Sequence, residues 1–134
     1  RELALTLGVD RALDADEADH VPPDITFDAS GKPAVAALAV KSVRRGGRAV
    51  LLSAVDAEVP VDMMNLLMGE KEIIASLSHS YKDDFPTAVR LLESGAVTVK
   101  PLITDRIPLA DVVTRGFEAL AADPSKHLKV LVFP

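Results

Sequence analysis

The side chains that most often form zinc sites and catalytic bases, histidine and cysteine, are scarce in this 134-residue sequence. The chain has three histidines, His20, His79 and His127, and no cysteine. No two of these histidines have the spacing of metal ligands, and without cysteine neither a thiolate zinc site nor a disulfide can form within the chain. His79 follows a predicted strand and is the best placed, but a surface histidine is the favoured interpretation. We therefore predict no catalytic and no metal-binding residue in this chain.

Two further patterns, a set of four serines and an acidic run, could indicate a hydrolase or a calcium site. Neither has the arrangement of residues that such a site needs. Four serines lie in or after predicted strand ends, namely Ser30, Ser53, Ser76 and Ser78. They have no His-Asp arrangement and no nucleophile elbow, which counts against a hydrolase. The acidic run at residues 14–19 suggests a calcium loop. Its sixth position is Asp19 rather than Gly and its twelfth is Ile25 rather than Glu, so we expect a solvated loop.

The remaining candidates are three segments at the ends of predicted strands: Ala29-Ser30-Gly31, Leu52-Ser53-Ala54 and Ala75-Ser76-Leu77. Ligands of parallel sheets bind at the C-terminal ends of the strands. Backbone N–H and C=O groups can bind a ligand there whatever the side chains are. The structural alternatives are an ordinary strand-to-helix turn at residues 29–31 and plain buried strand ends at the other two places.

The elements that position these segments alternate along the chain. We predict strands at residues 11–13, 24–29, 48–53, 72–77 and 128–133, and helices at residues 2–7, 34–43, 61–68, 83–94 and 109–122. Residues 49–53 read AVLLS, a continuous apolar run that is typical of a buried parallel strand. In the last helix, Val112, Val113, Phe117 and Leu120 would share a face. This order predicts an α/β fold with a mostly parallel sheet.

Composition narrows the class of protein. Hydrophobic residues make up 49% of the chain and aromatic residues 4%, so the core must be built from small aliphatic side chains. The net charge of −5 counts against a nucleic-acid-binding protein. The longest apolar run, residues 34–40, is far too short to span a bilayer. No signal peptide is visible, so we expect a cytoplasmic protein.

Several stretches together resemble the C-terminal part of medium-chain, zinc-type alcohol dehydrogenases. Residues 24–53 read DITFDASGKPAVAALAVKSVRRGGRAVLLS, which is similar to the second nucleotide-binding half of that family: a strand ending in an acidic residue, a Gly turn, an Ala-rich helix, and a Gly-Gly before a buried strand. Residues 71–97 resemble the next strand and helix, residues 100–120 the segment returning to the catalytic domain, and residues 126–134 its last strand. The likeness is greatest to butanediol and sorbitol dehydrogenases.

The resemblance implies a partial Rossmann domain at residues 1–77 and a returning catalytic segment at residues 78–134. The Gly-x-Gly-x-x-Gly turn that holds the pyrophosphate of NAD or NADP is absent from this sequence. Gly46-Gly47 does not replace it, because it precedes a strand rather than a helix. The zinc ligands of the family would also lie outside this chain.

The resemblance also assigns roles to the strand ends. Ala29 and Ser30 would lie beside a cofactor ribose, and Leu52 and Ser53 would hold the nicotinamide carboxamide through backbone groups. Ala75 and Leu77 would complete that clamp. A carboxamide needs one hydrogen-bond acceptor and one donor, and a strand end offers both. Lys129 would reach the pyrophosphate as a point charge, and its alternative is a solvated lysine on an edge strand.

The expected function is therefore that of a fragment. The intact enzyme would transfer a hydride between a secondary alcohol or polyol and NAD or NADP, with zinc polarising the alcohol oxygen. We expect this chain alone to be inactive. The alternatives are a piece of a zinc-free relative such as a quinone reductase, and a non-enzymatic interaction module of Rossmann descent. The family resemblance also implies pairing of residues 73–77 with a second copy, as a homodimer or a dimer of dimers.

Overall fold

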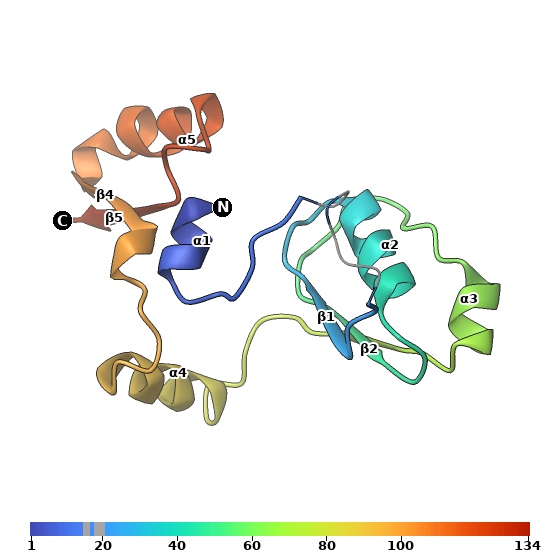
Figure 1. Ribbon diagram of the computed structural model, residues 1–134. Helices are drawn as coiled ribbons and strands as arrows, with labels where there is room; N and C mark the ends of the chain where they lie inside the picture. The colour runs from blue at the N-terminus through green and yellow to red at the C-terminus, as the bar shows by residue number, and fades with distance from the viewer. Residues whose placement is uncertain (15–16, 18–20) are drawn as a thin grey trace. The chain divides into compact units, whose positions relative to one another are not determined.

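The computed structural model describes residues 1–14, 17 and 21–134, and it divides into two compact units (Figure 1). Leu13–His79 form one, which we call the three-stranded unit, and Arg1–Ala12 together with Ser80–Pro134 form the other, the two-stranded unit. Four residues of the acidic run, at positions 15, 16, 18 and 19, lie outside the described residues, as does His20.

The three-stranded unit contains a parallel sheet in the order β1-β2-β3. Its strands are β1 (Ile25–Asp28), β2 (Arg48–Leu51) and β3 (Glu72–Ala75). Helix α2 (Pro33–Ser42) connects the first two strands, and the short helix α3 (Met63–Met68) connects the second and third. The register aligns the last residues Asp28, Leu51 and Ala75. The predicted α/β fold with parallel pairing is confirmed, and the three strand ends lie at one edge of the sheet.

The core of this unit lies between α2 and the first two strands. Its fully buried residues are small or β-branched, namely Ala36, Ala39, Val40, Val43 and Ala49. Thr26 of β1 donates its hydroxyl to the carbonyl of Ala39, at 2.9 Å. Ile25 and Phe27 share the opposite face of β1 and are 47% and 66% exposed. Thr26 and Asp28 therefore face α2, and the strand turns its polar side inward.

The two-stranded unit contains α1 (Glu2–Thr6), α4 (Asp84–Glu93), a short 3₁₀ turn η1 (Lys100–Leu102), and two parallel strands, β4 (Ile103–Pro108) and β5 (Lys129–Phe133). Strand β4 was not predicted, and residues 11–13, which were predicted as a strand, form none. A strand needs a neighbouring strand for its hydrogen bonds. Strand β4 finds one in β5, while residues 11–13 pair with no strand among the described residues.

The predicted helix at residues 109–122 is helical but not uniformly α-helical. It consists of a 3₁₀ turn η2 (Leu109–Asp111), a π-helical segment η3 (Val112–Glu118) and a short α5 (Ala119–Ala122). The wider π turn breaks the 3.6-residue period on which the predicted apolar face rested. Val113 and Phe117 are accordingly exposed, and Gly116 is buried in their place. The four residues therefore do not form one buried face: Val112 and Leu120 are half-buried, while Val113 and Phe117 are exposed.

A hydrogen bond between His127 and Asp105 links β4 to the segment before β5 and gives the two-stranded unit a pH dependence. His127 Nδ1 lies 2.9 Å from Asp105 Oδ2, and both side chains are about three-quarters buried. The hydrogen bond to His127, and after it the one from Thr104, holds the pKa of the Asp105 carboxyl below its usual range, against the effect of burial. A depressed folded-state pKa contributes stability above the unfolded value of about 3.9, and this contribution is lost as pH falls through the folded pKa.

We expect Asp105→Asn to lower the free energy of unfolding at pH 7 and to flatten its fall between about pH 5 and pH 3. Urea unfolding at several pH values measures this. Glu93→Gln, which changes an exposed carboxylate of α4, is the matched control. Its free energy of unfolding should vary with pH as that of the wild type does. An Asp105→Asn profile parallel to that of the wild type would show that the pair adds no pH dependence.

Candidate functional site

The candidate site is a pocket of about 270 Å³ at the C-terminal ends of β1, β2 and β3, which we call the strand-end pocket. Its volume is near the lower end for small-molecule sites. The residues that line it are Asp28, Ala36, Leu51, Ser53, Ala54, Val55, Ala57, Val59, Ala75, Ser76 and Leu77. It is therefore a mainly aliphatic pocket with a few polar groups at one edge, all from the three-stranded unit.

Asp28 is the charged residue at this edge, and it is 1% exposed. One carboxylate oxygen, Oδ1, accepts hydrogen bonds from the Ser30 hydroxyl at 2.7 Å and the Ser30 N–H at 3.1 Å. The other, Oδ2, accepts from the Ser53 hydroxyl at 2.7 Å. Asp28 thus joins the turn after β1 to the segment after β2.

These hydrogen bonds keep the carboxylate charged. The bond from the Ser30 hydroxyl contributes most to lowering the pKa of Asp28, followed by the Ser53 hydroxyl and the Ser30 N–H, while burial acts in the opposite direction. Hydrogen bonds to the charged form of an acid favour that form. At neutral pH, Asp28 is therefore an ionised hydrogen-bond acceptor at the wall of the pocket.

The turn after β1 packs closely against the segment after β2. Gly31 has φ +70°, in the left-handed region, and a Cβ placed on it would lie 3.4 Å from the carbonyl oxygen of Ala54. The Ser30 hydroxyl also accepts from the N–H of Lys32, at 3.1 Å. The N-cap of α2 is Lys32, with Pro33 in the first turn, so Ser30 organises the turn rather than capping the helix.

The structure brings together most of the site residues predicted from the sequence. Ser53, Ala75 and Leu77 line the strand-end pocket, and Ser30 is tied to it through Asp28. Ala29 is exposed in the same turn. The N–H of Leu52 donates to the Asp28 carbonyl at 2.9 Å, which continues the β1–β2 pairing by one residue.

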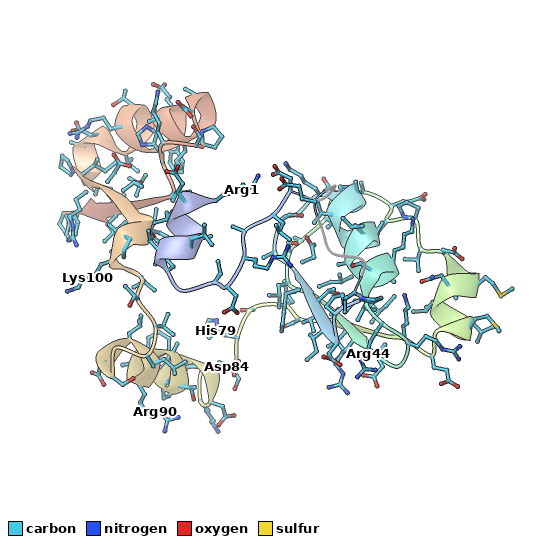
Figure 2. All side chains as sticks on the ribbon, in the orientation of Figure 1. Arg1, Arg44, His79, Asp84, Arg90 and Lys100 are labelled. Carbon is cyan, nitrogen blue, oxygen red and sulfur yellow. The ribbon has the colours of Figure 1, made fainter. Side chains whose placement is uncertain are left out.

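Two other sequence candidates lie elsewhere. Lys129 begins β5 in the two-stranded unit and is exposed. His79 lies in the segment that follows β3, where its Nδ1 is 3.5 Å from the Ser78 hydroxyl oxygen (Figure 2). Neither lines the strand-end pocket.

Asp28 is the site residue that the sequence analysis missed. The sequence pattern of a strand that ends in an acidic residue predicted no role for Asp28. A usable signal was present, since Asp28 is two positions after Thr26 and therefore on the same face of the strand. What no local pattern could indicate is that the partner hydroxyl comes from Ser53, 25 residues away.

Other features of the described residues do not compete with this pocket as a reactive site. A hollow of about 350 Å³ between α2 and α3 is lined mainly by alanine and aliphatic side chains and lies away from the strand ends. Within the described ranges, no three His, Cys, Asp or Glu side chains gather closely enough to hold a metal ion. None of the helices formed by the described residues has the length and apolar character that a bilayer crossing requires.

Residues 1–94 match the family model described as zinc-binding dehydrogenase. L-arabinitol 4-dehydrogenase from Hypocrea jecorina is 30% identical over 84% of this chain, which corresponds to 29% of that enzyme. The crystal structure of 2R,3R-butanediol dehydrogenase from Bacillus subtilis matches 83% of this chain and 31% of its own, with a TM-score of 0.71 and 28% identity.

An alcohol dehydrogenase from Escherichia coli CFT073, solved in complex with NADH, matches 99% of this chain with a TM-score of 0.85. Its sequence identity is 21%, so this likeness concerns the fold. The match covers 41% of that protein. The chain thus spans about a third of the length of the relatives that it matches.

Proposed function

Because the chain belongs to the zinc-binding dehydrogenase family, we propose that it is part of an enzyme that transfers a hydride between a secondary alcohol or polyol and NAD or NADP. The named relatives that act on arabinitol and butanediol support an alcohol or polyol as the substrate. The NADH complex of a protein with the same fold supports a nicotinamide cofactor. The quinone reductase and the interaction module considered from the sequence have no comparable support among these relatives.

The observation that carries the proposal is the position of the strand-end pocket. It lies at the C-terminal ends of three parallel strands, where dinucleotide-binding folds hold their ligand. Aliphatic walls suit a nicotinamide ring, and strand-end backbone groups suit its carboxamide. We assign the nicotinamide end of the cofactor to Ala29, Ser30, Leu52, Ser53, Ala75 and Leu77. Lys129 stays a proposed contact of the pyrophosphate.

We also propose a domain for each part of the chain. Residues 1–77 would belong to the nucleotide-binding domain and residues 78–134 to the catalytic domain. The boundary between the compact units after His79 supports a change of role near this point, although Arg1–Ala12 group with the second unit. The family resemblance implies that the zinc ligands lie outside this chain, where the metal would polarise the alcohol oxygen.

Cofactor binding is tested by titrating the ¹⁵N-labelled 134-residue chain with NADH and, separately, NADPH. We expect amide shifts at residues 29–31, 52–54 and 75–77, with a Kd on the order of 1 mM because no phosphate loop contributes. Gly46 and Gly69 follow α2 and α3, at the opposite end of the sheet, and serve as internal controls that should not shift. Shifts confined to the hollow between α2 and α3, or none at all, would contradict the proposal.

A cytoplasmic location and a homodimer complete the proposal. Strand β3 has β2 on one side, and no described strand pairs with its other edge. Its residues Ile73 and Ile74 are 40% and 38% exposed. An apolar edge strand of this kind pairs readily with another strand. The N–H groups of Glu72 and Ser76 point toward β2, so by alternation the N–H of Ile73 points to the open edge.

We expect Ile73→Pro to convert a dimer into a folded monomer, because it removes an outward N–H and spares the bonds to β2. Light scattering over a range of concentrations measures the mass. Ile74→Pro is the matched control, since it removes an inward N–H and should destabilise the sheet instead. A stable wild-type monomer at high concentration would contradict the dimer, and so would an Ile73→Pro variant that remains dimeric.

A further inference from the structure

The two serine hydroxyls bound to Asp28 are not equivalent. A hydroxyl donates one hydrogen bond and can accept two. The Ser30 hydroxyl donates to Asp28 and accepts from the Lys32 N–H, so it is largely satisfied within the turn. The Ser53 hydroxyl also donates to Asp28, but no donor among the described residues reaches its oxygen. Ser53 therefore lines the pocket with both lone pairs open.

Asp28 determines which way the Ser53 hydroxyl points. An ionised carboxylate accepts hydrogen bonds and donates none, and Asp28 is held ionised by its three donors. The proton of Ser53 is thereby committed to Asp28 Oδ2, at 2.7 Å. Because Asp28 is 1% exposed, water competes little for this bond. Toward a ligand in the pocket, Ser53 presents an acceptor and no donor.

We propose that Asp28 is a positioning residue that sets the polarity of Ser53, so that the strand-end pocket selects a ligand group that donates a hydrogen bond to Ser53 Oγ. The inference rests on the proposed function, in which the nicotinamide end of the cofactor occupies this pocket. That end carries two kinds of donor, the N–H of the carboxamide and the hydroxyls of the ribose. A ligand group with acceptors alone would face the lone pairs of Ser53 and would be disfavoured.

Asparagine at position 28 would reverse this polarity with little change of shape. Its side-chain oxygen can still accept from Ser30, but its NH₂ group cannot accept from Ser53. The NH₂ group would instead donate to Ser53 Oγ and occupy one lone pair, and the hydroxyl proton would turn to the carbonyl oxygen of residue 28, which lies 3.5 Å away, or into the pocket. Asp28→Asn is thus expected to weaken the ligand contact that Ser53→Ala removes.

The experiment measures NADH binding to the full 134-residue chain by amide shifts for the wild type, Asp28→Asn, Ser53→Ala and the double variant. Each single variant should bind NADH about threefold to tenfold more weakly, as expected for one hydrogen bond. The double variant should bind no more weakly than Ser53→Ala, because both changes act on one contact. Ser94→Ala, a serine in the two-stranded unit, is the matched control and should leave the affinity unchanged.

A cofactor analogue identifies the donor. Reduced 3-acetylpyridine adenine dinucleotide has a methyl ketone in place of the carboxamide and so lacks the amide N–H. If the carboxamide is the donor, the variants will not change the affinity for this analogue. If a ribose hydroxyl is the donor, they will weaken both ligands alike. Ser53→Thr keeps the hydroxyl and should retain affinity for NADH. If Ser53→Ala lost affinity because its fold was damaged, Ser53→Thr would lose affinity as well.

Should Asp28→Asn fail to fold, seen as rapid exchange of the Leu52 amide, the Ser53→Ala and Ser53→Thr pair decides the question. If the wild type binds NADH and Ser53→Ala binds it with the same affinity, this inference is overturned and the proposed function stands. A wild-type chain that shows no NADH shifts at the pocket overturns the proposed function, and this inference with it.

Discussion

Replacing Gly47 with alanine should destabilise the three-stranded unit by about 1–3 kcal/mol, the usual cost of forcing an extra methyl group into a packed site. A Cβ at this position would lie 2.6 Å from Val43 Cγ2, 2.8 Å from the Asp24 carbonyl oxygen and 2.9 Å from the Arg44 carbonyl oxygen. Val43 is 2% exposed, so its side chain is held by the packing around it. The two carbonyls belong to the backbone, so relief requires the chain itself to shift.

The backbone around Gly47 is also the point where the elements of this unit meet. The N–H of Arg48 donates to Asp24, and the N–H of Glu72 donates to Gly47, so the starts of all three strands are joined here. The Gly47 N–H donates to Arg44 at the end of α2. A shift large enough to admit a Cβ would therefore disturb several hydrogen bonds at once.

Thermal unfolding of the full chain measures this effect. A domain of this size loses about 4–8 °C in Tm for each kcal/mol. Gly95→Ala is the matched control, because a Cβ there meets nothing within 4 Å and adds the cost of its positive φ alone, about 1 kcal/mol. If Gly47→Ala unfolds at the wild-type temperature, or no lower than Gly95→Ala, the close packing around Gly47 is not what stabilises the unit.

The second large expected effect is the absence of catalytic activity. We expect the purified 134-residue chain to show no turnover of butanediol or sorbitol with either nicotinamide cofactor. It has no cysteine and no Gly-x-Gly-x-x-Gly turn, and it spans about a third of the length of its relatives. The Lewis-acid contribution of a catalytic metal is several kcal/mol, and about 4 kcal/mol corresponds to a roughly thousandfold loss of rate. Weak cofactor binding would lower the rate further.

Absorbance of NADH at saturating alcohol, with and without added zinc, measures the turnover. A polyol dehydrogenase of full length, assayed alongside, shows that the conditions support the reaction. Clear turnover by the chain alone would overturn the view that the reacting groups lie outside it. The outcome is independent of the binding titration, because a chain that binds NADH at the strand-end pocket can still lack the groups that react.

The elements with strong local signals were predicted closely. Helix α2 begins at Pro33, where proline is favoured, and it ends just before the Arg-Arg-Gly-Gly sequence, both within a residue of the prediction. The observed β2 and β3 begin where predicted, and each ends two residues earlier than predicted. These features depend on residues adjacent in the chain, so a single sequence suffices to find them.

The errors share a different physical origin. Strand β4 exists because β5 pairs with it, and that partner is more than 20 residues away. The segment at residues 109–122 was expected to follow one helical period, but its middle is a π helix. Gly116 in this helix packs so closely on β4 that an added Cβ would lie 3.5 Å from Ile107 Cδ1. In both cases contacts between distant segments decide the backbone, and no local pattern records those contacts.

Local signals in the sequence sufficed to predict the parallel α/β fold and the three strand ends that form the candidate site, because capping residues, turns and apolar runs act on their immediate neighbours. The family followed from the resemblance of several stretches in the right order. The tertiary structure alone decided that β1 turns Asp28 rather than Phe27 toward α2, and that this carboxylate binds Ser30 and Ser53 together. Burial and hydrogen bonding depend on which segments meet in space. The polarity of the pocket, on which its choice of ligand depends, arises at that level.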